Sequence, residues 1–166
     1  IMGQLTLTSG RISRFGDDRS DRPSFDIARS GIGLVPEGRQ VFSNLNVREN
    51  LQTFYRPPSD PTAKVWTYDR VLALFPGLAE RSENAGIHLS GGEQQMLAIG
   101  RALMTNPKLL ILDEATEGLA PIVRQQIWDC LNQLKQDGQS ILIIDKNVDA
   151  IARLADHNYI LDKGRV

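Results

Sequence analysis

Two adjacent carboxylates, Asp113 and Glu114, follow the fully apolar run at residues 109–112. Such a run is typical of a strand buried on both faces, and ligands collect at the carboxyl ends of strands in open α/β sheets. One carboxylate can hold Mg²⁺ through oxygen, and its neighbour can polarise a water molecule for attack on phosphorus. A strand that simply ends in a polar turn has the same pattern, so these residues alone leave both interpretations open.

A second segment whose residues could take part in binding or catalysis is Leu-Ser-Gly-Gly-Glu-Gln-Gln at residues 89–95. It opens a helical pattern that runs to Met104. Ser90 and Glu93 have the spacing of a capping box. Capping does not require the two glycines, Gly91 and Gly92, between them. Glycines there leave backbone N–H groups at the positive end of a helix open to an anion, and Ser90 adds a hydroxyl donor. The segment therefore predicts contact with an anion.

Alternating strand and helix patterns must position these residues. Strands are expected where apolar or alternating runs occur, at 11–15, 32–35, 109–112, 141–144 and 159–161. Helices are expected where apolar residues share one face, at 47–54, 65–75, 94–104, 121–134 and 148–154. Strand, helix, strand, helix, strand in the last third predicts right-handed crossovers and a parallel sheet.

Taken together, residues 89–95 and 109–114 resemble the signature motif and the Walker B strand of ABC ATPases. Within that family, the strings at 33–39, 47–51 and 117–121 resemble the ATP-binding subunit of branched-chain amino acid importers, the LivF type. The resemblance covers nearly the whole chain. It implies an α/β fold of the P-loop NTPase (ABC ATPase) class, a mostly parallel sheet with a helical subdomain.

The resemblance also implies how the chain is divided. Residues 1–166 would form one partial ABC ATPase domain. The helical subdomain would span about 42–104, signature motif included, and 1–41 and 105–166 would form the rest of the sheet-containing core.

Roles for individual residues follow from the same resemblance. ATP and Mg²⁺ are the expected cofactors, with Asp113 supporting Mg²⁺ and Glu114 acting as general base. A nucleotide held by a second, head-to-tail ABC ATPase subunit would be bound by Ser90, Gly91, Gly92 and Glu93. Membrane permease subunits would be the other partners, with the protein peripheral on the cytoplasmic face of the cell membrane.

Two positions depart from the general ABC pattern. Glu37 stands in place of the Q-loop glutamine, as in the LivF type, and is expected at the metal, between the Mg²⁺ site and the surface that touches the permease. Lys146 stands where the switch histidine usually follows the strand at 141–144. A lysine there could neutralise charge on the γ-phosphate and so join Glu114 in catalysis, or it could be a solvated turn residue.

The phosphate-cradling Gly-x-x-x-x-Gly-Lys-[Ser/Thr] loop, Walker A, occurs nowhere in the 166 residues. In the family this loop lies just upstream of a segment like the one that begins at Ile1. We therefore expect the chain to be the C-terminal portion of a longer ATPase, inactive alone. We also expect it to self-associate, because the missing strand would leave sheet edges unpaired.

Composition narrows the function classes. With 19 Lys and Arg against 20 Asp and Glu, the net charge of -1 argues against a protein that binds nucleic acid through general charge. One cysteine excludes a disulfide framework. The resulting hypothesis is the ATP-hydrolysing subunit of an ABC importer for branched-chain amino acids. Two alternatives stay open: a non-enzymatic ABC-fold module, and a chromosome-maintenance or DNA-repair ATPase. No heptad pattern of the kind found in the latter occurs here.

Overall fold

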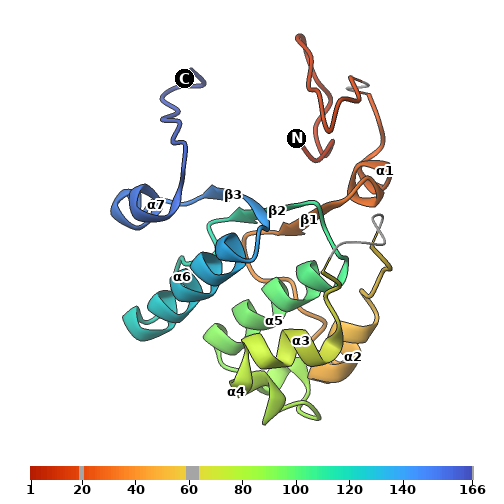
Figure 1. Cartoon of the computed structure of the whole chain (residues 1–166), viewed down its shortest axis with the longest axis vertical. Helices are drawn as coiled ribbons and strands as arrows, with labels where there is room; N and C mark the ends of the chain where they lie inside the picture. The colour runs from red at the N-terminus through yellow and green to blue at the C-terminus, as the bar shows by residue number, and fades with distance from the viewer. Residues whose placement is uncertain (19–20, 59–63, 166) are drawn as a thin grey trace.

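The computed structural model describes residues 1–18, 21–58 and 64–165. Figure 1 labels its helices and strands. In chain order they are α1 (Ser24–Arg29), β1 (Ile32–Val35), α2 (Val47–Gln52), α3 (Tyr68–Leu74), α4 (Pro76–Ala79), the 3₁₀ turn η1 (Gly86–His88), α5 (Gly91–Met104), β2 (Leu109–Asp113), α6 (Pro121–Gln136), β3 (Ser140–Ile144) and α7 (Val148–Leu154).

The strands form a parallel sheet in the order β1-β2-β3, as the alternating pattern predicts. The central strand β2 pairs on both sides, with Leu110 opposite Gly33 of β1 and opposite Ile141 of β3. Its middle residues, Leu110 to Leu112, are at most 3% exposed, which explains the continuous apolar run. All three carboxyl ends therefore meet at one edge of the sheet.

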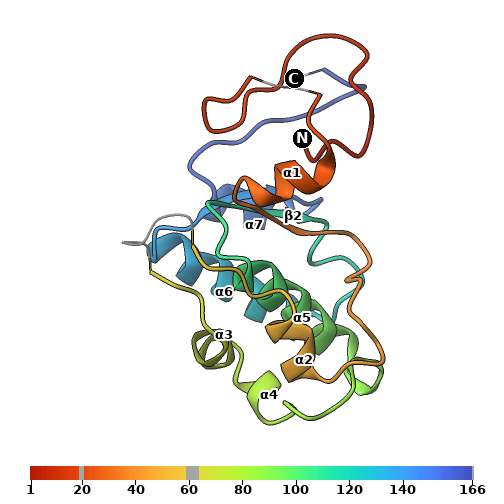
Figure 2. The same cartoon turned by 90° about the vertical axis from the view of Figure 1, so that its right-hand side faces the viewer.

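Helices cover the two faces of the sheet unequally. Figure 2 shows α1 on one face, with α5 and α6 against the other and α2, α3 and α4 beyond α5. On the α1 face, Ile27 packs with Ile32 and Ile111 in a small apolar cluster. The larger core lies on the α5 face and includes Leu97, Leu103 and other side chains that are fully buried.

The segment before α2 is organised by Asn50, whose side chain is completely buried. Its amide accepts a hydrogen bond from the N–H of Phe42 at 3.0 Å and donates to the carbonyls of Phe42, Leu45 and Asn46. Asn46 in turn caps α2 in a capping box with Glu49. One buried amide thus joins the loop after β1 to the helices packed against α5.

Two of the expected strands are wrong. At 11–15 the chain makes a tight turn in which Arg14 and Asp17 exchange two 2.9 Å backbone hydrogen bonds, because Phe15 and Gly16 have positive φ angles. At 159–161 the chain is not in a strand, and Tyr159, Ile160 and Leu161 are 72–82% exposed. An apolar run forms a strand only when another strand lies beside it to pair with, and these residues pair with no strand of the described sheet.

The observed helix bounds differ from most of the expected ones. Helix α2 ends at Gln52 rather than at 54, α3 covers Tyr68–Leu74 rather than 65–75, and α6 continues to Gln136 rather than ending at 134. The short helix α1 has no clear apolar period and was not expected. Pro76 does not merely end the preceding helix but begins α4, where proline is favoured at the first position. Helix α5 begins at Gly91 rather than Gln94 because Ser90 caps it. Within the described part of the chain, no helix is both long and apolar enough to cross a membrane.

Candidate functional site

The carboxyl edge of the sheet gathers the polar residues that follow each strand. Glu37 follows β1, Asp113 ends β2, and Lys146 comes two residues after β3. Because the strands are parallel and in register, residues far apart in the sequence meet at this edge.

Glu114 leaves the strand by a left-handed backbone conformation, with φ of 48°. Its N–H still donates to the carbonyl of Ile144 at 2.8 Å, which fixes the position of the turn against the end of β3. A non-glycine residue in this conformation costs about 1–3 kcal/mol and persists only where the surroundings hold it in place. Such strain is common at functional sites.

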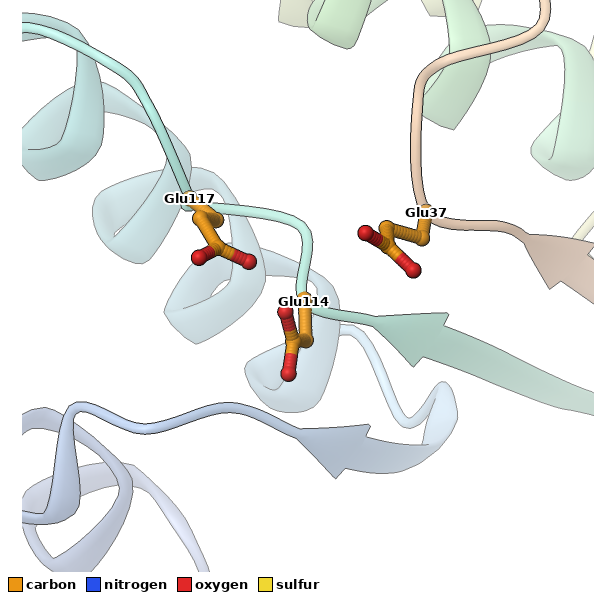
Figure 3. A group of neighbouring side chains, drawn as sticks. All are labelled: Glu37, Glu114 and Glu117. Carbon is orange, nitrogen blue, oxygen red and sulfur yellow. The ribbon is translucent and has the colours of Figure 1, made fainter.

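Three carboxylates come together at this edge. One oxygen from each of Glu37, Glu114 and Glu117 lies within 4.8 Å of the others. Figure 3 shows Glu37 reaching from the loop after β1 toward Glu114, with Glu117 on the turn after β2. Carboxylate oxygens are the ligands that Mg²⁺ prefers, so the donor set fits a divalent cation. Asp113 is half-buried and is not a member of this group.

Lys146 bridges two of these acids. Its Nζ lies 3.2 Å from Glu114 Oε2 and 3.1 Å from Glu117 Oε1. Hydrogen bonds to Glu117 and then Glu114 raise the pKa of Lys146 above its ordinary value. The hydrogen bond between the two acids is the largest influence on each of them: it raises the pKa of Glu114, against the effect of Lys146, and lowers the pKa of Glu117.

A cavity of about 340 Å³ lies beside these groups, lined by Glu114, Glu117 and Lys146 among others. Thr116 braces its wall by donating its hydroxyl to Asp145 Oδ2 at 2.7 Å, and Asp145 also accepts the N–H of Asn147 at 2.9 Å. The turn after β2 is thereby tied to the turn after β3.

The segment from Ser90 to Glu93 lies elsewhere, since none of its residues lines this cavity. Ser90 Oγ accepts the N–H of Glu93 at 3.3 Å, and Glu93 Oε2 accepts the N–H of Ser90 at 2.7 Å. The capping box expected from the sequence is therefore present. Glu93 also pairs with Arg81, whose Nε lies 2.6 Å from Glu93 Oε1. Ser90 is exposed at the end of the helix.

The two glycines of this segment have different surroundings. A Cβ on Gly92 would lie 2.5 Å from Val123 Cγ1, so α6 packs where a side chain would be. A Cβ on Gly91 would lie 2.9 Å from the guanidinium of Arg39. Close packing thus accounts for Gly92, a reason that the sequence pattern did not reveal.

The sequence predicts Glu37, Asp113, Glu114 and Lys146 at one site. The structure brings Glu37, Glu114 and Lys146 together, whereas Asp113 lies outside the group of three carboxylates. The sequence pattern did not single out Glu117 as a member of that site. The only available signal was the position of Glu117, three residues after Glu114 in a segment ending with Gly118, whose φ of 67° permits a tight turn.

Comparison with known proteins agrees with this geometry. The "ABC transporter" family model matches residues 1–117. The chain is 45% identical to the high-affinity branched-chain amino acid transport ATP-binding protein BraG of Pseudomonas aeruginosa, over 100% of this chain and 71% of that protein. It is 34% identical to the probable branched-chain amino acid transport ATP-binding protein LivF of Archaeoglobus fulgidus, over 100% of this chain and 70% of that protein.

Solved structures give the same result. A nucleotide-free ATP-binding cassette from an ABC transporter superposes with a TM-score of 0.81 at 26% identity, covering 99% of this chain and 70% of that one. An ATP-binding cassette in its ADP conformation superposes with a TM-score of 0.77 at 26% identity, covering 98% and 69%. The chain has the fold of these cassettes and belongs to the ABC transporter family.

Proposed function

We propose that this chain is part of the ATP-binding, ATP-hydrolysing subunit of an ABC importer for branched-chain amino acids. The observation that carries the proposal is the 45% identity to BraG over the whole chain. The carboxylates gathered at the edge of the sheet support the hydrolytic part of it. The two branched-chain amino acid relatives are transport proteins by name, which favours transport over chromosome maintenance or DNA repair.

In this proposal Glu114 takes the proton from the attacking water molecule. Asp113 and Glu37 would hold Mg²⁺, with Glu117 beside Glu37 as a further oxygen donor, and the ion would supply positive charge to the phosphate oxygens. Lys146 holds Glu114 and Glu117 in place before nucleotide arrives. Its charge is then available to the γ-phosphate. We assign the helical subdomain to about residues 42–104 and the sheet-containing core to residues 1–41 and 105–166.

Ser90, Gly91 and Gly92 would act on a nucleotide held by a second subunit. Exposure of Ser90 at the positive end of a 14-residue helix supports this role, as does the separation of this segment from the cavity beside Glu114. We keep Glu93 with these nucleotide-contacting residues. It would hold the N-terminal end of α5 in shape through its hydrogen bond with Ser90 and its ion pair with Arg81. The expected partners are this second subunit and membrane permease subunits, with this chain peripheral on the cytoplasmic face of the cell membrane.

A chimera tests the proposal. The chain would replace the matching segment of BraG in Pseudomonas aeruginosa, so that BraG supplies the remaining part of its own sequence. Uptake of labelled leucine is expected to return, and the substitution Glu114→Gln is expected to abolish it. The 166-residue chain alone is expected to hydrolyse no ATP, because Walker A is not among its residues.

Two results would separate the parts of the proposal. A chimera that hydrolyses ATP without restoring uptake would contradict the importer assignment and leave the ATPase assignment standing. A chimera that accumulates in the membrane fraction and neither hydrolyses ATP nor restores uptake would favour a non-enzymatic module.

A further inference from the structure

The hydroxyl of Thr116 makes a buried contact to which the proposed function gives no role. Thr116 is only 4% exposed, although it follows Glu114 by two residues at the polar edge of the sheet. A buried hydroxyl needs a hydrogen-bond partner, and this one donates to Asp145 Oδ2 at 2.7 Å, across 29 residues of sequence. The bond therefore joins the turn that carries Glu114 to the turn that carries Lys146.

Backbone pairing does not hold these two turns together. The register of β2 with β3 ends with Asp113 opposite Ile144, and the N–H of Glu114 adds one further bond to the carbonyl of Ile144. Among the residues that the structure describes, no backbone hydrogen bond joins residues 115–117 to residues 145–147. The relative position of the two turns therefore depends on side chains.

Asp145 passes the constraint from Thr116 to the backbone on either side of Lys146. Its Oδ2 accepts the hydroxyl of Thr116, and its Oδ1 accepts the N–H of Asn147 at 2.9 Å. Asn147 in turn caps α7 by accepting the N–H of Ala150 at 3.2 Å. Lys146 thus lies between two residues that are each fixed by a neighbour, although its own side chain is exposed.

A fixed backbone matters for Lys146 because its side chain is long and loses rotamer freedom when the ammonium is held. Its Nζ lies 3.2 Å from Glu114 Oε2 and 3.1 Å from Glu117 Oε1. The side chain is 72% exposed, so water competes for both contacts. A nitrogen–oxygen distance of about 3.6 Å is no longer a hydrogen bond, so a shift of this turn by less than about 1 Å would break them.

We propose that the hydrogen bond between Thr116 and Asp145 positions Lys146 between Glu114 and Glu117, which makes Thr116 a positioning residue of the hydrolytic site. This inference rests on the proposed function, in which Lys146 holds Glu114 in place and offers its charge to the γ-phosphate. Thr116 contacts neither nucleotide nor attacking water and acts only through Asp145 and Lys146.

The position of Lys146 can be tested in the 166-residue chain without any hydrolysis. In nuclear magnetic resonance spectra of isotope-labelled lysine, the two protons on Cε differ in chemical shift when the ammonium is held and coincide when it rotates freely. The Lys146 protons, identified by their loss in Lys146→Met, are expected to differ in the unaltered chain and to coincide in Thr116→Val. Lys135, whose Nζ lies 2.7 Å from both the carbonyl of Leu154 and Asp156 Oδ1, is the internal control and should not change.

ATP turnover in the BraG chimera tests the consequence for hydrolysis. Thr116→Val is expected to lower kcat by about three- to tenfold with the KM for ATP unchanged, and Thr116→Ser, which keeps the hydroxyl, is expected to restore kcat. Thr105→Val is the matched control, because Thr105 also donates its hydroxyl at 2.7 Å, to the carbonyl of Ala102, but does not line the cavity beside Glu114. Melting temperatures establish that both valine variants are folded.

A double variant separates positioning from stabilisation of the two turns. If Thr116 acts through Lys146, Thr116→Val should lower kcat no further in a chimera that already carries Lys146→Met. A bond that only stabilised the turns would lower kcat equally in both backgrounds. Asp145→Ala breaks the same bond from the partly exposed side, where water in the cavity can reach the freed hydroxyl, and it replaces Thr116→Val in every comparison if that variant does not fold.

Three results would overturn the proposal. They are Lys146 protons that behave alike in the unaltered chain and in Thr116→Val, equal kcat in Thr116→Val and Thr105→Val, and an equal loss of kcat with and without Lys146. Failure of the proposed function would look different, because Glu114→Gln would then leave turnover unchanged. The resonance comparison would still decide whether Thr116 positions Lys146.

Discussion

Lys146 Nζ lies 3.2 Å from Glu114 Oε2, although 32 residues separate the two in sequence. Both follow neighbouring parallel strands, and the N–H of Glu114 donates to Ile144, two residues before Lys146. The pair is therefore a consequence of sheet register. It places a cation beside the carboxylate that the proposed mechanism uses as a base.

Replacing Lys146 separates its chemical contribution from its structural one. Because its side chain is 72% exposed, its two ion pairs are screened by water, and Lys146→Met is expected to leave the urea midpoint of unfolding unchanged. In the BraG chimera the same substitution is expected to lower ATP turnover by about tenfold or more, since one charge on the phosphate is no longer neutralised. Unchanged turnover would identify Lys146 as a solvated turn residue.

Gly92 provides a prediction about packing. Gly92→Ala is expected to destabilise the chain by about 1–3 kcal/mol, because the new Cβ would lie 2.5 Å from Val123 Cγ1. Urea denaturation measures the change. The double variant Gly92→Ala, Val123→Ala should recover part of it.

Gly77 is the matched control for this prediction. A Cβ there meets nothing within 4 Å, and Gly77 lies in α4. Gly77→Ala is expected to be neutral or to stabilise by about 0.4–1 kcal/mol. If both alanine variants had the same stability, the close approach of α5 to α6 at Gly92 would be contradicted.

The pH dependence of stability should report the environment of Glu93. Partial burial acts to raise its pKa, but hydrogen bonds from Ser90 and the ion pair with Arg81 outweigh burial, so the pKa lies below its ordinary value of 4.5. A lowered carboxyl pKa stabilises the folded state above the unfolded-state pKa, and this contribution disappears as pH falls through the folded-state pKa.

The comparison of the unaltered chain with Glu93→Gln tests this sign. The unaltered chain should be the more stable at pH 7, and its advantage should shrink as pH falls below about 4.5. Urea midpoints across this range measure it. An advantage that grows on acidification would show that the pKa of Glu93 is raised instead.

Cys130 is expected to be unreactive in the folded chain. It is 7% exposed, and burial raises the pKa of its thiol to about 12. Dithionitrobenzoate at pH 8 should modify it many times more slowly than in unfolding concentrations of urea. Because it is the only cysteine, the absorbance reports this thiol alone. Equal rates with and without urea would contradict the buried position on α6.

The sequence correctly predicts the structural features that depend on residues close together in the chain. The buried strand before Asp113, the cap at Ser90 and the proline that begins α6 all depend on near neighbours in the chain, and all are present. Glu37 and Glu114 could be placed at one site because parallel strands end together.

Features that depend on distant packing could not be predicted in this way. Nothing local to Gly92 indicates that Val123 will pack against it. The apolar run at 159–161 has the pattern of a strand, but it pairs with no strand of the described sheet. Glu117 joins the site only because the turn after β2 brings it back toward Lys146.

We propose that the carboxylate edge of this sheet hydrolyses ATP with Glu114 as the base. The ATP turnover of the BraG chimera tests this role of Glu114. The variant Glu114→Gln is compared with Glu80→Gln, which makes the same change at an exposed position that follows α4. Glu114→Gln is expected to lower turnover by about 10²–10⁴-fold without loss of ATP binding, while Glu80→Gln is expected to have no effect. Equal turnover in the two variants would contradict it.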